Sequence, residues 1–345
     1  MTGHAAPSPR VLPDPHPRAG LPDRVRVYEV GPRDGLQAES ARIPVEVKAG
    51  FCRRLIAAGV TNLEVTSFVS PKWVPQLADA ADLMDVLTAD GTLDRRGVRS
   101  VVLAPNLRGL ERAVRAGARE IAVFVSATET FAHRNLNTTV DGAIDAAAPV
   151  VTAAATAGMP VRGYISMCFG DPWEGRVAVS DVARVARRLL DIGCGTLSLG
   201  DTIGVATPGH VIEVLDAVQD AGARADQLAT HFHDTYGQAL SNVYAALRYG
   251  ITEFDSSAGG LGRCPYAAGA TGNLATEDLL WMLHGLGIDT GIDIDALIDT
   301  SLWLAGHIGH PPASPTVAAL AAQRAHADGV EHSHMKARQA GGLTP

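Results

Sequence analysis

The sequence holds few cysteines and almost no lysine. Its four cysteines lie far apart with no C-x-x-C pair, at Cys52, Cys168, Cys194 and Cys264. This spacing favours reduced thiols in a cytoplasm over a disulfide framework or a zinc knuckle. Lysine occurs only three times, so arginine carries nearly all of the positive charge.

The chain also lacks a basic excess and a long apolar run. Its formal net charge is −8, which argues against a general nucleic-acid-binding protein. No apolar stretch reaches the roughly 18 residues that span a bilayer, and the start has no apolar core of a secretory signal. With 46% hydrophobic and 19% charged residues, the composition is that of a soluble globular protein. We therefore expect a cytoplasmic protein with no nucleic acid and no membrane among its partners.

Irregular sequence bounds the chain at both ends. Residues 1–22 are rich in proline, and residues 325–345 are polar without periodicity, so both stretches predict disorder. Between them, the sequence predicts a catalytic domain over residues 23–290 and a helical extension over residues 291–324.

Short runs of β-branched and apolar residues recur along the middle of the chain. Most are followed by apolar residues at three- and four-residue spacing, as in residues 45–59 and 180–193, which indicates helices. The predicted strands lie at residues 24–30, 61–68, 98–105, 120–127, 160–167, 195–202, 227–234 and 252–259. Strands that alternate with helices imply a parallel sheet with right-handed crossovers.

Eight such units over roughly 250 residues match the count and length of a closed (β/α)₈ barrel. The alternative is a doubly wound open sheet, which usually has a glycine-rich phosphate turn after its first strand. The turn found here, GPRDGLQ, does not fit G-x-G-x-x-G. The sequence therefore predicts an α/β fold, namely a TIM barrel with a short C-terminal helical extension.

The barrel restricts where catalytic groups can lie. In this fold they occur at the carboxyl ends of the strands and in the loops that follow. Polar residues of six predicted strands and their loops fit that rule, and they include Glu29, Asp34, Glu64, Ser67, Tyr164, Ser198, Asp201, Thr202, His231, His233 and Asn273. We expect these side chains to converge on one mouth of the barrel.

Two histidines stand two residues apart in the stretch THFHDTYGQ. Because alternate side chains of a strand share a face, His231 and His233 should point the same way. An isolated pair of this kind is more often two ordinary histidines with hydrogen bonds to protein or water than a metal site. Here the barrel adds Asp34 and Asn273, and the mixed nitrogen and oxygen donors suit Mg²⁺ or Mn²⁺. The alternatives are a turn residue for Asp34 and a helix N-cap for Asn273.

Four further residues are candidates for the chemistry. Arg33 offers a fixed positive charge to a developing oxyanion, or forms an ion pair at the barrel rim. Glu64 and Asp201 are acid–base groups or partners of that arginine, and their positions do not separate the two roles. Cys264, in a glycine-rich loop over the mouth, is a candidate acid, base or nucleophile, or else packs in the core.

Five motifs, in order, resemble the hydroxymethylglutaryl-CoA lyase family. They are VYEVGPRDGLQ, NLEVTSFVSPKWVPQLAD, LSLGDTIGVATPG, HFHDTYGQALSN and GGLGRCPYAAGATGNLATEDL, and they extend over about residues 24–290. The family belongs to a metal-dependent barrel superfamily that also holds isopropylmalate and homocitrate synthases. The resemblance implies a carbon–carbon lyase of leucine degradation and ketone-body formation.

The resemblance also implies roles for individual residues. The family's metal ligands match Asp34, His231, His233 and Asn273. Its enolate-stabilising arginine and its loop cysteine match Arg33 and Cys264. Further residues implicated in catalysis match Glu64, Asp201 and Tyr164. Positions that line the substrate match Gln37, Ser67, Ser198 and Thr202.

The implied reaction is the cleavage of (S)-3-hydroxy-3-methylglutaryl-CoA to acetoacetate and acetyl-CoA. It is a retro-Claisen step, which removes a proton from a tertiary hydroxyl group and leaves a carbanion stabilised as a thioester enolate. The expected cofactor is Mg²⁺ or Mn²⁺. The expected partners are the acyl-CoA substrate and a second copy of the chain in a homodimer.

Two departures from the family pattern leave the acyl group open. Arg263 stands before the loop cysteine where the family usually has glycine, and residues 171–175 read D-P-W-E-G rather than C-P-Y-E-G. One alternative is therefore a lyase for a related branched 3-hydroxyacyl-CoA. A second is a condensing acyltransferase of the isopropylmalate or homocitrate synthase type, although such enzymes usually carry further C-terminal domains. A third is a non-catalytic barrel that senses acyl-CoA or metal.

Overall fold

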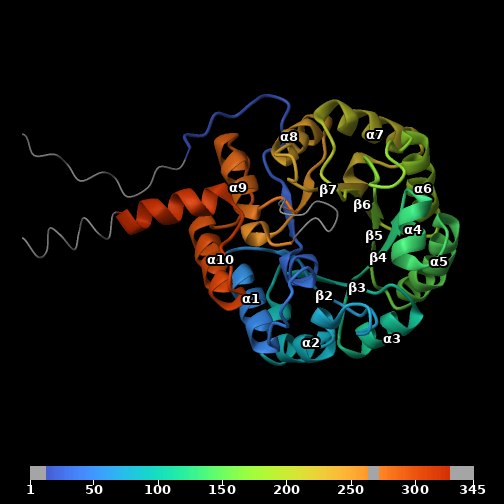
Figure 1. Ribbon diagram of the computed structural model, residues 1–345, viewed down its shortest axis with the longest axis horizontal. Helices are drawn as coiled ribbons and strands as arrows, with labels where there is room; N and C mark the ends of the chain where they lie inside the picture. Colours follow the sequence, from blue (N-terminus) through green and yellow to red (C-terminus); the bar gives the residue numbers. More distant parts are fainter. Residues whose placement is uncertain (1–12, 263–271, 327–345) are drawn as a thin grey trace, which may run out of the picture.

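Eight parallel strands form the centre of the computed structural model, which describes residues 13–262 and 272–326. Their bounds are β1 (Arg26–Glu29), β2 (Asn62–Ser67), β3 (Arg99–Leu103), β4 (Ile121–Ser126), β5 (Val161–Ser166), β6 (Thr196–Asp201), β7 (Leu228–Phe232) and β8 (Glu253–Ser256). Each strand falls inside one of the predicted runs. The strands pair in chain order and β1 closes on β8, so the predicted TIM barrel is confirmed (Figure 1).

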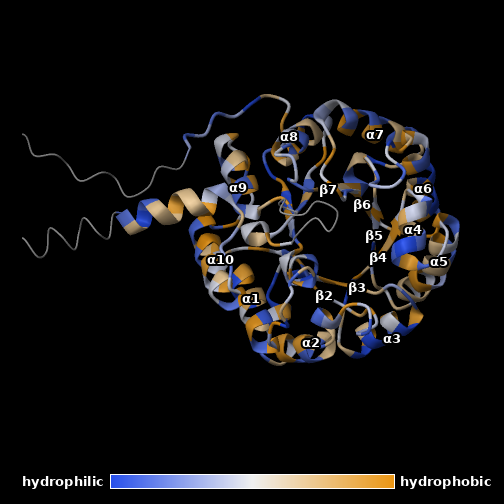
Figure 2. Ribbon diagram, in the orientation of Figure 1, coloured by the Kyte–Doolittle hydropathy of each residue, from blue (hydrophilic) through white to orange (hydrophobic). Residues whose placement is uncertain are grey.

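Helices form a ring outside the strands (Figure 1). Their bounds are α1 (Val45–Ala57), α2 (Ala80–Ala89), α3 (Leu107–Arg115), α4 (Glu129–Leu136), α5 (Val140–Thr156), α6 (Val179–Asp191), α7 (Pro208–Asp220), α8 (Ala239–Tyr249), α9 (Thr276–Gly285) and α10 (Ile294–Ile308). Helix α1 lies within the stretch predicted at residues 45–59, and α6 covers most of the stretch predicted at residues 180–193 but begins one residue earlier. Hydrophobic and hydrophilic residues share the same helices in Figure 2, as expected for helices that bury one face against a barrel.

The pleat of the strands separates two sets of side chains. Leu63, Phe232 and Phe254 point outward and pack in the main apolar core with the helices. Their neighbours in the same strands point into the barrel, because successive side chains of a strand face opposite ways. The period-two pattern therefore decides which polar residues reach the interior.

The interior of the barrel holds both apolar and charged side chains. One apolar cluster contains Tyr28, Val30, Val101, Leu103, Ala122 and Tyr164. Arg162 of β5 forms ion pairs with Glu253 and Asp255 of β8. Because β5 and β8 are not neighbours in the sheet, these pairs cross the interior. Barrels of this fold usually fill that space with Val, Ile and Leu, so a buried ion network is a distinguishing feature of this one.

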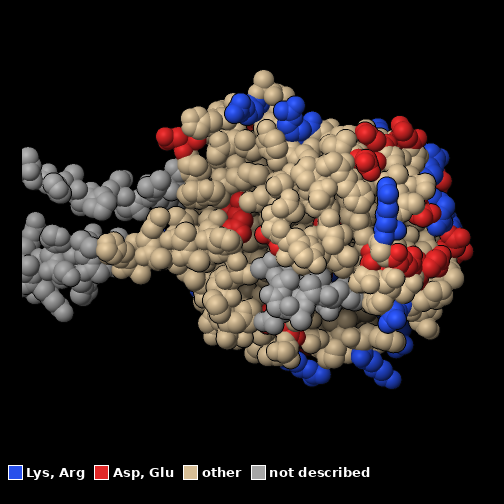
Figure 3. All heavy atoms as spheres, turned by 45° about the horizontal axis from the view of Figure 1, so that its top comes forward, with Lys and Arg blue, Asp and Glu red and all other residues tan. Residues whose placement is uncertain are grey.

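The outer surface carries ion pairs between neighbouring helices. Arg188 of α6 contacts Asp141 and Asp145 of α5. Acidic and basic side chains are intermixed at the right edge of Figure 3, on the side where Figure 1 shows α5 and α6. Exposed pairs of this kind contribute about 0–1 kcal/mol each, so the fold depends mainly on its buried layers.

The segments beside the barrel pack on its outside. Helix α10 packs on α1, and a further helix follows at residues 315–326. Residues 13–22, part of the stretch for which the sequence predicts disorder, run beside the end of α9, where the His16 N–H donates to the Gly285 carbonyl oxygen (2.8 Å). No helix among the described residues is long and apolar enough to cross a membrane.

The buried Glu29 carboxyl group ties three segments together at the carboxyl end of β1. Its Oε1 accepts hydrogen bonds from the N–H of Gly31 (2.8 Å) and of Ala258 (2.9 Å). Its Oε2 accepts one from the Thr276 hydroxyl (2.7 Å). The turn η1 (Gly31–Gly35), the turn η5 (Ala258–Gly260) and the start of α9 are thereby fixed to one carboxyl group. Burial raises the pKa of Glu29 to about 7.

A second buried carboxyl group, that of Glu277, holds the same turn. Its Oε2 accepts from the Gly259 N–H (2.8 Å), and its Oε1 accepts from the Ser301 hydroxyl. Gly259 has φ of 67°, a left-handed conformation that glycine adopts without strain. Burial raises the pKa of Glu277 to about 8.

These raised pKa values predict that stability declines as pH rises. The folded protein keeps protons on Glu29 and Glu277 that the unfolded chain releases above about pH 4.5, so their contribution is complete below that pH and is lost as pH rises through 7 to 8. Each protonated group should give a slope of about 1.4 kcal/mol per pH unit in the free energy of unfolding. Glu277→Gln should flatten the slope by about that amount between pH 5 and 8 in denaturant titrations. Glu46→Gln, an exposed change in α1, is the control. An unchanged slope in Glu277→Gln would show that Glu277 is ionised in the fold.

Candidate active site

The two histidines lie at the end of β7. His231 and His233 share the inner face, while Phe232 between them packs outward in the core. Their ring centroids are 5.3 Å apart. Together with Asp34, they offer donor atoms that all lie within 4.8 Å of one another. The structure therefore brings these three predicted ligands together.

Asp34 belongs to η1, the tight turn after β1. Its backbone N–H donates to the Val30 carbonyl oxygen (2.8 Å), which fixes the turn. A Cβ at Gly35 would lie 2.9 Å from the Leu261 side chain, so glycine allows the turn to approach the segment after β8. Burial alone would raise the pKa of Asp34, but the charges of Arg33 and His231 lower it to about 2. The side chain is therefore a carboxylate.

Asn273 reaches the site because its backbone pairs with the end of β7. The Asp234 N–H donates to the Gly272 carbonyl (2.7 Å), and the Leu274 N–H donates to the Phe232 carbonyl (3.1 Å). The Asn273 amide nitrogen donates to Asp34 Oδ2 (2.9 Å) and to the Leu261 carbonyl oxygen (3.0 Å). Helix α9 begins only at Thr276, after Ala275 as its N-cap, so the N-cap alternative for Asn273 is wrong.

The donor set fits a divalent cation. His233 Nδ1 and Asn273 Oδ1 are buried and have no hydrogen-bond partner among the described residues. A buried polar atom without a partner costs about 1–3 kcal/mol, and a bound cation would remove that cost for the amide oxygen. Burial, and then the charge of His231, lower the pKa of His233 to about 3, so its ring is neutral and able to bind a cation. One carboxylate, two imidazoles and one amide oxygen are hard and borderline ligands.

His231 has a partner that the sequence analysis did not single out. Its Nδ1 lies 3.3 Å from Oδ2 of Asp255, which is fully buried inside the barrel. Burial would lower the pKa of His231, but the hydrogen bond and the charge of Asp255 raise it. The signal was available in the alternation of Glu253 and Asp255 around Phe254, which places both acids on the inner face of β8.

Arg33 makes two ion pairs at the mouth. Its Nε donates to Glu64 Oε2 (2.7 Å), and its Nη1 donates to Asp34 Oδ1 (2.8 Å). Glu64 is fully buried, and although the charge of Arg33 opposes it, burial raises the pKa of Glu64. The Tyr164 ring lies 5.6 Å from Arg33 Cζ. Glu64 is thus the partner of this arginine, and Asp201 is not among the residues that pair with it.

Asp201 holds the loop after β6. Its two carboxylate oxygens accept from the N–H groups of Val205 (2.9 Å) and Ala206 (3.0 Å). Burial raises the pKa of Asp201 to about 6, although these hydrogen bonds oppose the shift. A carboxyl group that titrates near neutral pH suits proton transfer.

The remaining predicted residues surround the same end of the barrel. The Ser198 hydroxyl is buried and donates to Asp255 Oδ2 (2.8 Å). Ser67 Oγ accepts from the Val69 N–H (3.2 Å). Thr202 Oγ1 accepts from the N–H of Met167 (2.9 Å), whose φ of 60° is unusual for a non-glycine residue. Tyr164 lies in the apolar cluster inside the barrel.

Gln37 and Cys264 complete the set of predicted site residues. Gln37 is half-buried and directly follows Leu36, three positions after Asp34. Cys264 and the neighbouring Arg263 lie outside the described residues, so the role expected for the loop cysteine stays a prediction. The other cysteines, Cys52, Cys168 and Cys194, are buried and free.

The fold and the donor set define the class of protein, a (β/α)₈ barrel with a metal-competent site at its carboxyl end. The chain belongs to the HMGL-like family, which matches residues 24–303.

Named relatives cover most of the chain. It is 51% identical over 301 residues to a mitochondrial hydroxymethylglutaryl-CoA lyase of Arabidopsis thaliana, covering 87% of this chain and 63% of that protein. It is 48% identical to a 3-hydroxy-3-isohexenylglutaryl-CoA/hydroxymethylglutaryl-CoA lyase of Pseudomonas aeruginosa, covering 88% of this chain and 99% of that one. The crystal structure of a hydroxymethylglutaryl-CoA lyase from Pseudomonas aeruginosa superposes with a TM-score of 0.84 at 48% identity, over 88% of this chain and 99% of that chain.

The site predicts that His233→Ala loses metal affinity without losing the fold. Removing a ligand should weaken Mn²⁺ binding by more than about 100-fold, beyond the 10–100-fold typical of groups that only support a ligand. Thermal unfolding should change little, because His233 lies outside the apolar core. Calorimetric titration with Mn²⁺ measures the affinity. His307→Ala, at an exposed position of α10, should bind as the parent protein does. Equal affinity in His233→Ala would exclude this residue as a ligand.

Proposed function

We propose that this protein is a hydroxymethylglutaryl-CoA lyase that works with Mg²⁺ or Mn²⁺. It would cleave (S)-3-hydroxy-3-methylglutaryl-CoA to acetoacetate and acetyl-CoA. The observation that carries the proposal is the position of Arg33, which contacts the ligand Asp34 and the buried Glu64 at the barrel mouth. The lyases named among its relatives support the same reaction.

The reaction requires that charge be stabilised at two places. A base takes the proton of the tertiary hydroxyl, the oxygen forms a ketone, and the carbon–carbon bond breaks. The electron pair of that bond passes to the thioester as an enolate, which is protonated on carbon to give acetyl-CoA. A divalent ion held by the four donors would supply Lewis acidity for the hydroxyl group. The protein must then provide charge for the enolate and groups that move the two protons.

Arg33 is the group that we propose to stabilise the enolate. Its Nε and Nη1 are engaged by Glu64 and Asp34, which lock the plane of the guanidinium, and neither of these bonds uses Nη2. A donor group held in advance at the position where negative charge develops stabilises the transition state more than the ground state. We therefore propose that Arg33 stabilises the negative charge on the enolate oxygen.

Three groups are proposed to move protons. Glu64 and Asp201 both have raised pKa values, and Asp201 titrates at about 6, so they are the candidates for the base and for proton relay. Cys264, outside the described residues, keeps the role that the family resemblance implies, as the acid that protonates the carbanion. Tyr164 keeps the catalytic role that the family resemblance implies, and Gln37, Ser67, Ser198 and Thr202 are proposed to shape the substrate site.

A lyase for a larger branched acyl group is the second candidate, and the loop after β5 favours it. Asp171 is buried and accepts from the Trp173 N–H (2.7 Å), the Glu174 N–H (2.9 Å) and the Thr128 hydroxyl (2.6 Å). This fixes Trp173, whose ring stacks on Arg134 at 4.5 Å and remains 39% exposed. An exposed aromatic ring in the loop after β5 would offer an apolar surface to a longer substituent.

The setting of the enzyme is also part of the proposal. The buried free thiols of Cys52, Cys168 and Cys194 support the cytoplasm expected from the sequence. We propose a homodimer of chains in which residues 23–290 form the catalytic domain and residues 291–324 its helical extension.

The proposal predicts metal-dependent cleavage of the glutaryl thioester. Purified protein, treated with chelator and then supplied with Mg²⁺ or Mn²⁺, should release acetoacetate and acetyl-CoA from 3-hydroxy-3-methylglutaryl-CoA. The same assay with 3-hydroxy-3-isohexenylglutaryl-CoA ranks the second candidate by kcat/KM. Incubation with acetyl-CoA and 2-oxo acids tests for a condensing synthase. Cleavage of neither thioester in the presence of metal would refute the lyase assignment.

Arg33→Lys should lower kcat with little change in KM. Lysine keeps the charge but loses the planar fork that Glu64 and Asp34 orient. The loss in kcat should be on the order of 100-fold or more, because the negative charge of the enolate develops in the transition state and is absent from the bound substrate. Steady-state kinetics measure both constants, and Arg53→Lys on the outside of α1 is the control. A near-normal kcat would return Arg33 to the role of a rim ion pair.

A further inference from the structure

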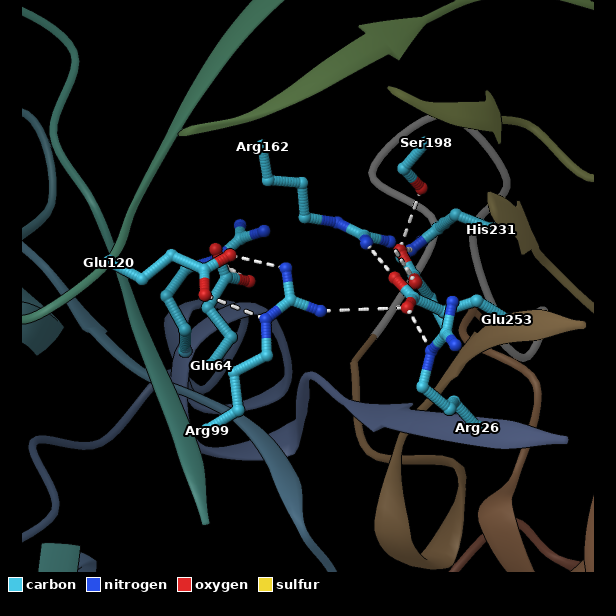
Figure 4. Close-up of polar contacts among 10 residues, drawn as sticks. Arg26, Glu64, Arg99, Glu120, Arg162, Ser198, His231 and Glu253 are labelled. Carbon is cyan, nitrogen blue, oxygen red and sulfur yellow. Dashed lines mark hydrogen bonds and ion pairs between the residues drawn. The ribbon is translucent and has the colours of Figure 1, made fainter. Parts of the chain in front are cut away.

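Asp255 lies directly behind one of the proposed metal ligands. Its side chain is fully buried inside the barrel, and its Oδ2 lies 3.3 Å from His231 Nδ1. The same oxygen accepts a hydrogen bond from the Ser198 hydroxyl (2.8 Å), and Oδ1 is paired with Arg162. Figure 4 shows the side chains of Ser198, Arg162 and His231 turned toward one another.

Arg162 is itself held from several sides. It is fully buried, and its second terminal nitrogen is paired with Glu253. Its Cζ lies 4.1 Å from the centre of the Tyr28 ring, at cation–π distance. The guanidinium therefore has one position, and it holds the Asp255 carboxylate in one orientation.

Glu253 extends the network to the amino-terminal end of the strands. Its carboxylate forms ion pairs with Arg26 (2.8 Å) and Arg99 (3.5 Å). Arg99 in turn donates a hydrogen bond from Nε to Glu120 (2.7 Å). These partners come from β1, β3 and the residue before β4, as Figure 4 shows. A buried charge without a partner costs several kcal/mol, so these pairs stabilise the buried charges of Arg162 and Glu253.

The contact with Asp255 determines which nitrogen of His231 carries the proton. A carboxylate can only accept hydrogen bonds, so Nδ1 must be the donor. In the neutral ring, Nε2 then carries the lone pair. A histidine ligand whose other nitrogen is held by a carboxylate has a fixed tautomer, a fixed ring orientation and a more basic donor atom.

We propose that Asp255 is a positioning residue, which presents His231 Nε2 to the cation with Arg162 and Ser198 as its supports. This inference rests on the proposed function, because it assumes that the site holds a divalent cation. Under this proposal, the buried charged side chains of β5 and β8 support the metal site in addition to stabilising the fold. Asp255 itself contacts neither substrate nor cation in this assignment.

The test compares Asp255→Asn with a matched change in the same strand. Asn keeps the shape of Asp255 but removes the charge that Arg162 pairs with. Glu253→Gln also removes one partner of Arg162 from the inner face of β8, yet Glu253 does not contact His231. Calorimetric titration with Mn²⁺ gives the affinity of each variant, and thermal unfolding gives its stability.

The expected result is a specific loss of metal affinity. Asp255→Asn should bind Mn²⁺ about 10–100-fold more weakly than the parent protein, while Glu253→Gln should bind within about threefold of it, even though both lose stability. An equal loss of affinity in the two variants, or none in Asp255→Asn, would overturn the assignment. If the parent protein does not bind Mn²⁺, the metal site of the proposed function fails and this inference fails with it.

A second measurement decides the role without metal. Long-range ¹⁵N–¹H NMR of histidine-labelled, metal-free protein, with His231→Gln for assignment, should show His231 protonated on Nδ1. Ser198→Ala, which keeps every charge, should mix the tautomers and weaken Mn²⁺ binding in the same direction as Asp255→Asn but by less. This variant answers the question even if Asp255→Asn fails to fold. A His231 ring protonated on Nε2 in the parent protein would overturn the proposal.

Discussion

The charged side chains inside the barrel are buried, and a buried charge is costly unless a group of opposite charge lies beside it. Arg162 of β5 meets Asp255 of β8 across the interior, and Arg33 meets Glu64 of β2 at the mouth. The Tyr164 ring lies near both guanidinium groups, with its centre 5.6 Å from Arg33 Cζ and 5.2 Å from Arg162 Cζ. Each member restricts its neighbours, so the site is ordered before a substrate arrives. Preorganisation of this kind is the main source of electrostatic catalysis.

The fold and most of the candidate ligand set could be predicted because both depend on short periods in the sequence. Alternation of two residues separates inner from outer side chains, which placed His231 and His233 on one face around Phe232. The order of strands in a closed parallel barrel then brings the first, seventh and eighth together. No longer-range information was needed to group Asp34 with the histidines.

The contacts across the barrel could not be predicted in the same way. The identity of the acidic residue that pairs with Arg162 depends on the tilt and stagger of strands that are not neighbours in the sheet. Neither quantity can be predicted from a local sequence pattern. Hydrogen bonding also divided roles that looked alike: Glu64 binds Arg33, whereas both oxygens of Asp201 hold a loop. Asn273 had two interpretations until the start of α9 at Thr276 excluded the cap.

The Glu29 carboxyl group joins β1 to Ala258 and Thr276, which follow it by 229 and 247 positions in the chain. Asp34 and Asn273 are likewise separated by nearly the whole barrel. During synthesis the first strand is made long before its last partners, and the entropy of closing so long a loop is offset only when the ring of strands is complete. A cation that binds these donors binds the closed chain alone and stabilises it by mass action. Metal supply in the cell would then govern the yield of folded protein as well as its rate of turnover.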